Sequence, residues 1–211
     1  TEGYIWIADP NHIACFDTRT GELCGRYRTE WARSFQAEGE TGCDRPYGIS
    51  NDADGNIWWG QWTCGGLGYL DREVWETARA ENSDQSGTIW DNVEDVVNYL
   101  GTYRFQDPND DKTRGVAVDG NGMVWVASSG TNRMLRFDPS LPAPQWRSDA
   151  HAACIEECTV NRTRPNGSII GAGDDLSACT NYCGPNVQGD FTGSYETCSN
   201  PIGVGISDDG D

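Results

Sequence analysis

The stretch Gly55-Asn56-Ile57-Trp58-Trp59-Gly60 is a short apolar strand built around tryptophan, and the sequence contains such a strand three times. The other copies are Gly3-Tyr4-Ile5-Trp6-Ile7-Ala8 and Gly122-Met123-Val124-Trp125-Val126-Ala127. Self-similarity of this kind indicates a repeat architecture, in which each copy is one unit of supersecondary structure. The repeat therefore decides the fold class, and we expect the recurring tryptophan to be a core residue in every copy.

A shorter apolar strand and a tight turn precede two of these copies. They are Tyr47–Gly55 and Arg114–Gly122, and a third such lead-in, Ile202–Gly210, stands at the end of the sequence. Asp, Asn and Gly in the turns favour tight hairpins. After each tryptophan strand comes a polar loop and a third strand that ends in aspartate. These third strands are Ile13–Asp17, Leu67–Asp71 and Met134–Asp138.

Each unit thus predicts four antiparallel strands, the fourth being clearest at Glu22–Arg26. The pattern G-[IV]-x-x-D-x-x-G-x-[VI]-W-[VIFW], followed by a loop and an aspartate-terminated strand, resembles the blades of the streptogramin-lyase and NHL-repeat β-propellers. The resemblance covers the repeat cores and leaves out the long connections between them. It implies an all-β fold made of four-stranded propeller blades, and it says little about activity because propellers carry many functions.

The repeat cores divide the chain into about three blades' worth of one propeller segment. The connections between them lengthen along the chain and are predicted as insertions. We expect residues 1–27 to form strands two to four of a blade, 45–71 a blade core, 72–111 an insertion, 112–140 a blade core, 141–197 a cysteine-rich insertion, and 198–211 the first strand of an incomplete blade.

Both insertions are expected to contain helices on one face of the propeller. In the first, apolar residues recur at helical spacing. The residues predicted to share one face of this helix are Ile89, Val93, Val96, Val97 and Leu100.

The second insertion contains four cysteines arranged as two pairs, each spaced four residues apart. Cysteines four apart share a helix face, so two short helices are predicted to form a hairpin joined by Cys154–Cys183 and Cys158–Cys179. A zinc site made by the same cysteines, with His151 nearby, is the alternative interpretation.

Two further disulfides are predicted, Cys15–Cys24 across a hairpin and Cys43–Cys64 within one unit. Cys198 is predicted to be unpaired or to form an intermolecular disulfide. Nine cysteines in an acidic, glycine-rich chain favour an oxidising compartment. We therefore expect a secreted protein, extracellular or attached to the cell surface.

The composition excludes some classes of partner. The 211 residues carry a net charge of -18, and such a surface repels phosphate backbones, so no nucleic-acid binding is expected. No uninterrupted apolar run reaches ~18 residues, so no membrane insertion is expected either.

The acid excess is typical of a highly soluble surface. Cation binding by acidic loops is the alternative, which leaves room for a structural divalent cation such as calcium; no other cofactor is predicted.

Three blades are too few for a ring, because propellers close with about four to eight blades. The strands at the two ends of the repeat would expose unpaired backbone hydrogen-bonding groups. We predict that these strands pair with another copy of the chain, in a closed ring or a filament, or with the remaining blades of a larger propeller. The predicted assembly edges are Tyr4, Ile5, Trp6, Ile7, Val204, Gly205 and Ile206.

The loops after the tryptophan strands and the residues just before the first strands should share one end of the blades, around the mouth of the channel. This polar, partly cationic rim is the default binding site. Trp62 in this rim has no counterpart in the other units. Together with Trp31, Trp75 and Trp90 it is expected to pack the insertions onto the propeller, and the alternative is a platform for a sugar ring or a partner. The candidate residues are Asp9, His12, Arg45, Tyr47, Trp62, Lys112, Arg114, Asn132 and Arg133.

No catalytic or metal-binding residue is predicted. The resemblance implies a histidine–glutamate pair with magnesium in streptogramin lyases, but His12 and His151 stand in no matching motif. The carboxylate and asparagine ligands of gluconolactonase-like propellers find no counterpart either. The segment Asp52–Asn56 lacks the acids that an EF-hand loop requires, and we interpret it as a β-turn.

The sequence therefore favours an exported, non-catalytic scaffold or surface protein, which assembles or binds partners through open blade edges and one loop face. Two alternatives stay open. One is a lyase- or lactonase-type enzyme whose active residues lie on blades outside this chain. The other is a propeller that binds carbohydrate.

Overall fold

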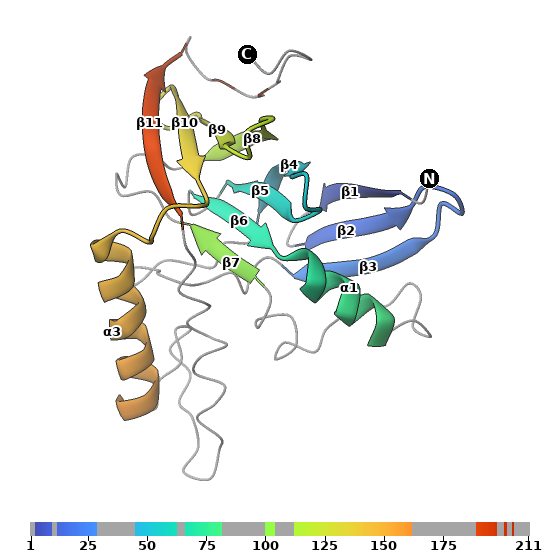
Figure 1. Ribbon diagram of the computed structural model, residues 1–211, viewed down its shortest axis with the longest axis horizontal. Helices are drawn as coiled ribbons and strands as arrows, with labels where there is room; N and C mark the ends of the chain where they lie inside the picture. The colour runs from blue at the N-terminus through green and yellow to red at the C-terminus, as the bar shows by residue number, and fades with distance from the viewer. Residues whose placement is uncertain are drawn as a thin grey trace.

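Three antiparallel sheets stand side by side in chain order (Figure 1). The computed structural model describes residues 3–9, 12–28, 45–62, 66–81, 100–103, 112–161 and 189–197, together with Pro201 and Val204. The all-β fold class and the blade-like sheets agree with the prediction from the repeat. Within this described part, no helix is long and apolar enough to cross a membrane.

The first sheet has the order β1-β2-β3. Its strands are β1 (Tyr4–Asp9), β2 (His12–Asp17) and β3 (Leu23–Arg28). A register shift after Cys15 places Phe16 opposite Leu23. The structure contains the Cys15–Cys24 disulfide that the hairpin register predicted, with Cα atoms 5.3 Å apart. β1 lies at the edge of this sheet, because β2 is its only strand neighbour among the described residues.

The second sheet has the order β4-β5-β6-β7. Its strands are β4 (Pro46–Asn51), β5 (Ile57–Gln61), β6 (Leu67–Leu70) and β7 (Leu100–Tyr103), and helix α1 (Arg72–Glu81) follows β6. Leu100 pairs with Leu70 in β6, so its assignment to an insertion helix is wrong. The physical reason is that this segment supplies the fourth strand of the blade. The rest of the predicted helix, residues 89–99, lies outside the described residues.

The third sheet has the order β11-β10-β9-β8. Its strands are β8 (Thr113–Val118), β9 (Val124–Ser128), β10 (Arg133–Asp138) and β11 (Asp190–Glu196), and helix α3 (Gln145–Asn161) follows β10. The stretches predicted as insertions, 72–111 and 141–197, therefore each contain the fourth strand of a blade. Cys158 in α3 is disulfide-bonded, which favours the disulfide interpretation of this region over zinc, and its partner is not among the described side chains.

The turns before β5 and β9 are held by the same hydrogen bonds, which are accepted by one aspartate in each turn. Asp52 accepts hydrogen bonds from the indole Nε1 of Trp58 at 2.9 Å and from two backbone amides of its turn. Asp119 accepts the same set, with Nε1 of Trp125 at 2.9 Å. Burial raises the pKa of Asp119, but the hydrogen bonds from Trp125 and the turn amides outweigh it and hold that pKa below its usual value. The aspartate is thus an acceptor for the turn, as the β-turn interpretation expects.

The sheets pack through alternate residues of the tryptophan strands. Ile57 and Trp59 of β5 face the first sheet and form a buried cluster with Ile13 and Tyr27. Trp58 between them faces the opposite way, where it joins a second cluster with residues of the third sheet. Because side chains alternate across a strand, each sheet can bury one face against the sheet before it and the other against the sheet after it.

The three repeated tryptophans are therefore not equally buried. Trp58 is a core residue, as expected. Trp6 is half-buried and packs its ring against Trp75, with centroids 5.2 Å apart. Trp125 is also half-buried and stacks on Tyr195 instead of entering the core, so the prediction for it is wrong. Its face of the third sheet has no further sheet against it among the described residues.

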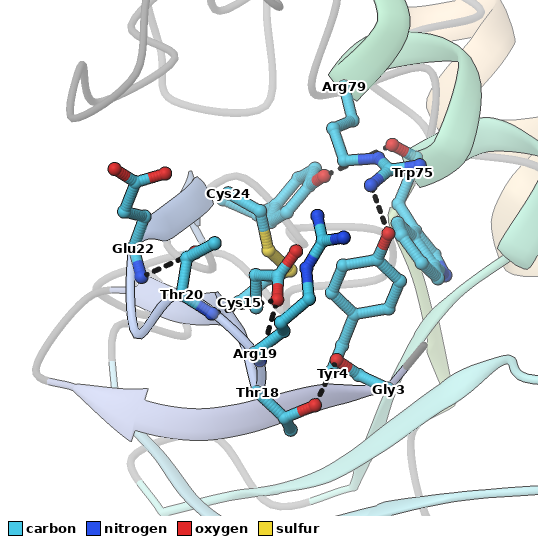
Figure 2. Close-up of a disulfide and its surroundings, with 12 residues drawn as sticks. Gly3, Tyr4, Cys15, Thr18, Arg19, Thr20, Glu22, Cys24, Trp75 and Arg79 are labelled. Atoms are coloured by element: carbon cyan, nitrogen blue, oxygen red, sulfur yellow. Dashed lines mark hydrogen bonds between the residues drawn. A yellow bond between two sulfur atoms is a disulfide. The ribbon is translucent and has the colours of Figure 1, made fainter. Parts of the chain in front are cut away.

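Helix α1 contacts both the first and the second sheet. Its residue Trp75 is buried in the cluster between them, and the hydroxyl of Tyr27 donates to the Trp75 carbonyl at 3.3 Å. Arg79 lies over the Tyr4 ring, 4.9 Å from its centroid, and donates to the Tyr4 hydroxyl (Figure 2). Burial raises the pKa of the Tyr27 phenol, so this hydroxyl remains a donor. The helix therefore contributes to the interface between blades.

We expect Gly60→Ala to destabilise the fold, because the second and third sheets approach closely at this glycine. A Cβ at Gly60 would lie 2.6 Å from the backbone oxygen of Arg114 and 3.1 Å from the carbonyl carbon of Thr113. Forcing these backbones apart should lower the free energy of unfolding by about 1–3 kcal/mol. Urea unfolding with the disulfides intact measures this difference. The matched control is Gly120→Ala, because a Cβ there meets nothing within 4 Å. Equal stability of the two variants would contradict this packing.

Asp119→Asn should destabilise the protein in a pH-dependent way. Folding lowers the pKa of Asp119. The ionised carboxylate therefore stabilises the folded protein at pH values above about 3.9, the pKa of an aspartate in the unfolded chain. This stabilisation is lost as the pH falls through the lower pKa of Asp119 in the folded protein. The variant should therefore be less stable than the wild type near neutral pH, and the difference should shrink in acid. Asp54→Asn, in the neighbouring blade's turn, serves as control. A difference in unfolding free energy that is constant with pH would refute this role.

Candidate functional site

All nine candidate binding residues lie at or next to the strand ends that were predicted to form the rim. The register pairs Pro46 with Gln61, Thr113 with Ser128 and Asp9 with His12. The starts of β4 and β8 thus lie at the same end of their sheets as the turns that follow β5 and β9. We call this end, together with the β1–β2 turn, the loop end.

At the loop end the structure brings together Tyr47, Trp62 and Arg114, which we call the aromatic–arginine cluster. The Arg114 guanidinium lies over the Trp62 ring at 4.4 Å from its centroid, and at 5.8 Å from that of Tyr47. The two rings are 5.8 Å apart and inclined by 32°. Tyr47 is 52% exposed, so one aromatic surface of the cluster faces solvent. The cluster joins residues from the second and third sheets.

A buried threonine holds the two sheets in place beneath this cluster. The amide of Gln61 donates to Oγ1 of Thr113 at 2.7 Å. The same hydroxyl lies 2.9 Å from the carbonyl oxygen of Gln61 and 2.7 Å from that of Gly66, and it donates to one of them at a time. Thr113 is fully buried and directly precedes Arg114, while Gln61 directly precedes Trp62. These hydrogen bonds therefore set where the guanidinium meets the indole.

The Arg114 side chain retains unused hydrogen-bonding capacity. Its Nε is buried without a hydrogen-bond partner, and within the described part of the chain the guanidinium makes no ion pair or hydrogen bond. Its contacts are with the two aromatic rings. Because guanidinium donors lie in the plane of the group, stacking on a ring leaves them available to an acceptor at the edge.

Two other cationic residues lie close to the cluster along the chain. The backbone amide of Trp62 donates to the Arg45 carbonyl at 2.9 Å, which places exposed Arg45 next to Trp62. Exposed Lys112, two residues before Arg114, has a left-handed backbone with φ 59, and its carbonyl accepts a hydrogen bond from the Ser129 hydroxyl at 2.9 Å. Among the described residues, Arg45 and Lys112 thus add positive charge next to the cluster in an acidic protein.

The remaining candidates are not joined to the cluster by any contact found among the described residues. Asp9 and His12 flank the β1–β2 turn. Asn132, with φ 56, and Arg133 follow β9, and the Asn132 carbonyl accepts from the Thr197 hydroxyl at 2.9 Å. Trp75 of α1, which the sequence grouped with Trp62, is buried between the first and second sheets. Trp31 and Trp90 lie outside the described residues.

Thr113 and Gln61 are absent from the nine candidates chosen from the sequence, although both are fully buried polar residues at this site. Both Oε1 and Nε2 of Gln61 are buried without a hydrogen-bond partner. In the sequence they look like ordinary strand residues at the start of one strand and the end of another. The only available signal was their position, each directly before a predicted rim residue.

The predicted assembly edges are described in part. β1 contains Tyr4 to Ile7 at its sheet edge, with Ile5 55% and Ile7 42% exposed. Val204 is described outside any strand, whereas Gly205 and Ile206 lie outside the described residues. Of the cysteines, Cys43, Cys64, Cys179, Cys183 and Cys198 also fall outside them, so their pairing stays a prediction. No three His, Cys, Asp or Glu side chains in the described ranges are grouped so that they could hold a metal ion.

Comparison with known proteins finds one curated relative with limited coverage. The chain is 32% identical over 130 residues to "Putative sugar lactone lactonase YvrE" of Bacillus subtilis (strain 168), and the match covers 61% of this chain and 42% of that protein. The chain thus spans less than half the length of this relative. No family model matches the sequence.

Solved structures of lyases also match part of this chain. A catalytically inactive virginiamycin B lyase from Staphylococcus aureus with quinupristin matches 65% of this chain and 35% of its own, at 16% identity and a TM-score of 0.41. A streptogramin B lyase structure matches 64% and 33%, at 17% identity and a TM-score of 0.40. The repeated tryptophan strand, the three antiparallel sheets and the partial match to the lactonase support an NHL-like and lyase-like β-propeller fold for this chain.

Proposed function

We propose that this chain is a non-catalytic propeller scaffold that assembles with further blades through two open faces. The observation that carries the proposal is the exposure of Ile5 and Ile7, which are 55% and 42% exposed. In the repeat these positions correspond to residues of β5 and β9 that are buried against the preceding sheet. The equivalent residues, each no more than 1% exposed, are Ile57, Trp59, Val124 and Val126.

The first open face, on the outer side of the first sheet, therefore has the character of a blade interface. Burying one isoleucine completely contributes about 1.5–3 kcal/mol, so covering these two half-exposed side chains contributes about 2 kcal/mol in total. Among the described residues no strand pairs with the outer edge of β1, and such an edge favours the addition of a strand. A further blade placed as the first sheet is placed against the second would cover this face, and a strand added beside β1 would pair its backbone.

The second open face, on the outer side of the third sheet, carries the half-buried Trp125. In the second sheet the equivalent Trp58 is buried against the next blade. Around Trp125 lie Tyr195, which is 47% exposed, and Arg136, whose guanidinium is 5.9 Å from the Trp125 centroid. The first open face corresponds to the side of a blade that packs on the preceding blade, and the second to the side that packs on the following blade. Each can therefore bind a blade from another copy or from the rest of a larger propeller.

Export is part of the proposal. The Cys15–Cys24 disulfide and the disulfide-bonded Cys158 agree with folding in an oxidising compartment. Charge repulsion from a net charge of -18 would keep assemblies in solution and would weaken association at low ionic strength.

The native mass of the protein, measured over a range of concentrations, tests the assembly. We expect a defined closed species or a growing series of species larger than one chain. Ile7→Lys should shift the distribution towards single chains, because it places a charge on the first open face. The control is Val160→Lys, which changes a 69% exposed apolar residue of α3 and should have no effect. A stable, soluble single chain at every concentration would disprove the scaffold.

A second candidate function, lactone hydrolysis, is favoured by the 32% identity to the relative named as a sugar lactone lactonase. Incubating the protein with a sugar lactone such as glucono-1,5-lactone, with and without added divalent cations, separates the two candidates. The scaffold proposal expects hydrolysis at the spontaneous rate under all conditions. Cation-dependent hydrolysis that a chelator abolishes would establish the enzyme instead.

A further inference from the structure

We propose that the aromatic–arginine cluster, Tyr47, Trp62 and Arg114, binds a sugar ring that carries one carboxylate, such as a uronic acid residue. This inference goes beyond the scaffold role and does not depend on it. It rests on three features of the described residues: an exposed aromatic surface, a guanidinium with free donors, and a buried support that fixes their relative positions.

The aromatic surface suits the apolar face of a sugar ring. Tyr47 is 52% exposed, and its ring is inclined by only 32° to that of Trp62. Aromatic side chains combine a large apolar surface with few rotatable bonds, so they bind a flat partner at a low entropic cost. The C–H groups on one face of a pyranose form such an apolar surface, while its hydroxyls stay in water.

The guanidinium of Arg114 supplies recognition of a carboxylate. It is held over the Trp62 ring at 4.4 Å from the centroid, and within the described residues no carboxylate or carbonyl accepts from it. Because its Nε is buried, an incoming acceptor would bind the two terminal nitrogens of the guanidinium, whose donors lie in the plane of the group. A carboxylate matches the fork of guanidinium donors with two parallel hydrogen bonds.

The support beneath the cluster indicates that it is formed before a ligand arrives. The hydroxyl of buried Thr113 lies 2.7 Å from the Gln61 amide nitrogen and 2.7 Å from the Gly66 carbonyl oxygen. These contacts fix the backbone next to Arg114 and next to Trp62. A site fixed in this way loses little conformational freedom on binding, which favours affinity.

Charge limits the ligand to a lightly charged one. Among the described residues, Arg45 and Lys112 add positive charge next to Arg114, but the protein as a whole carries -18. The long-range field therefore repels a dense polyanion, whereas a single carboxylate is attracted at short range. A sugar ring with one carboxylate satisfies both conditions.

Isothermal titration of the protein with methyl β-glucuronide, methyl β-glucoside and acetate tests the site. The glucuronide should bind at least about tenfold more tightly than the neutral glucoside, since its carboxylate adds charge-assisted hydrogen bonds. Acetate should bind more weakly than the glucuronide, since it lacks the ring. Absence of glucuronide binding, or equal affinity for the glucoside or for acetate, would overturn the proposal.

Variants assign the binding to the cluster. Arg114→Lys keeps the charge but loses the planar fork, so it should weaken glucuronide binding about tenfold. Tyr47→Ala should weaken it as well, whereas Tyr47→Phe, which keeps the ring, should bind like the wild type. Arg19→Gln removes an exposed cation from the β2–β3 turn, at the other end of the first sheet, and should leave affinity unchanged. Unaltered affinity in both Arg114→Lys and Tyr47→Ala would place binding elsewhere and refute the site.

Discussion

The alternation of side chains along the second strand of each blade is the constraint on which this structure depends. In β5, Ile57 and Trp59 are buried against the first sheet, and Trp58 between them is buried towards the third. A strand that is apolar on both faces needs a sheet on each side. The same strand in the first sheet has a described neighbour on one side only, which explains why Ile5 and Ile7 remain half exposed.

The same interface that builds the core also positions the loop end. The second and third sheets approach so closely at Gly60 that a Cβ there would lie 2.6 Å from the Arg114 carbonyl oxygen. This approach lets the Thr113 hydroxyl reach the backbone of Gln61 across the sheets. Arg114 and Trp62, the next residue of each segment, then stack at 4.4 Å. Packing between blades and the geometry of the candidate binding site are therefore one property of the fold.

The repeat allowed the strands with a strong local signature to be predicted, and the limits of the prediction have physical causes. The tryptophan strands and the Cys15–Cys24 pairing follow from alternation and hairpin register within one unit. The fourth strands β7 and β11 carry no repeat signature, and their place depends on pairing with β6 and β10 after long connections. The rim residues could be identified one by one, but the contact between Trp62 and Arg114 arises only when two sheets pack together.

Hydrogen exchange of the β1 amides, followed as the protein concentration is raised, tests most directly whether the edge of the first sheet pairs with a strand from a further blade. The account predicts that exchange in β1 slows with concentration, while exchange in β5, which already lies between two strands, stays constant. Exchange in β1 that remains equally fast at every concentration would contradict it.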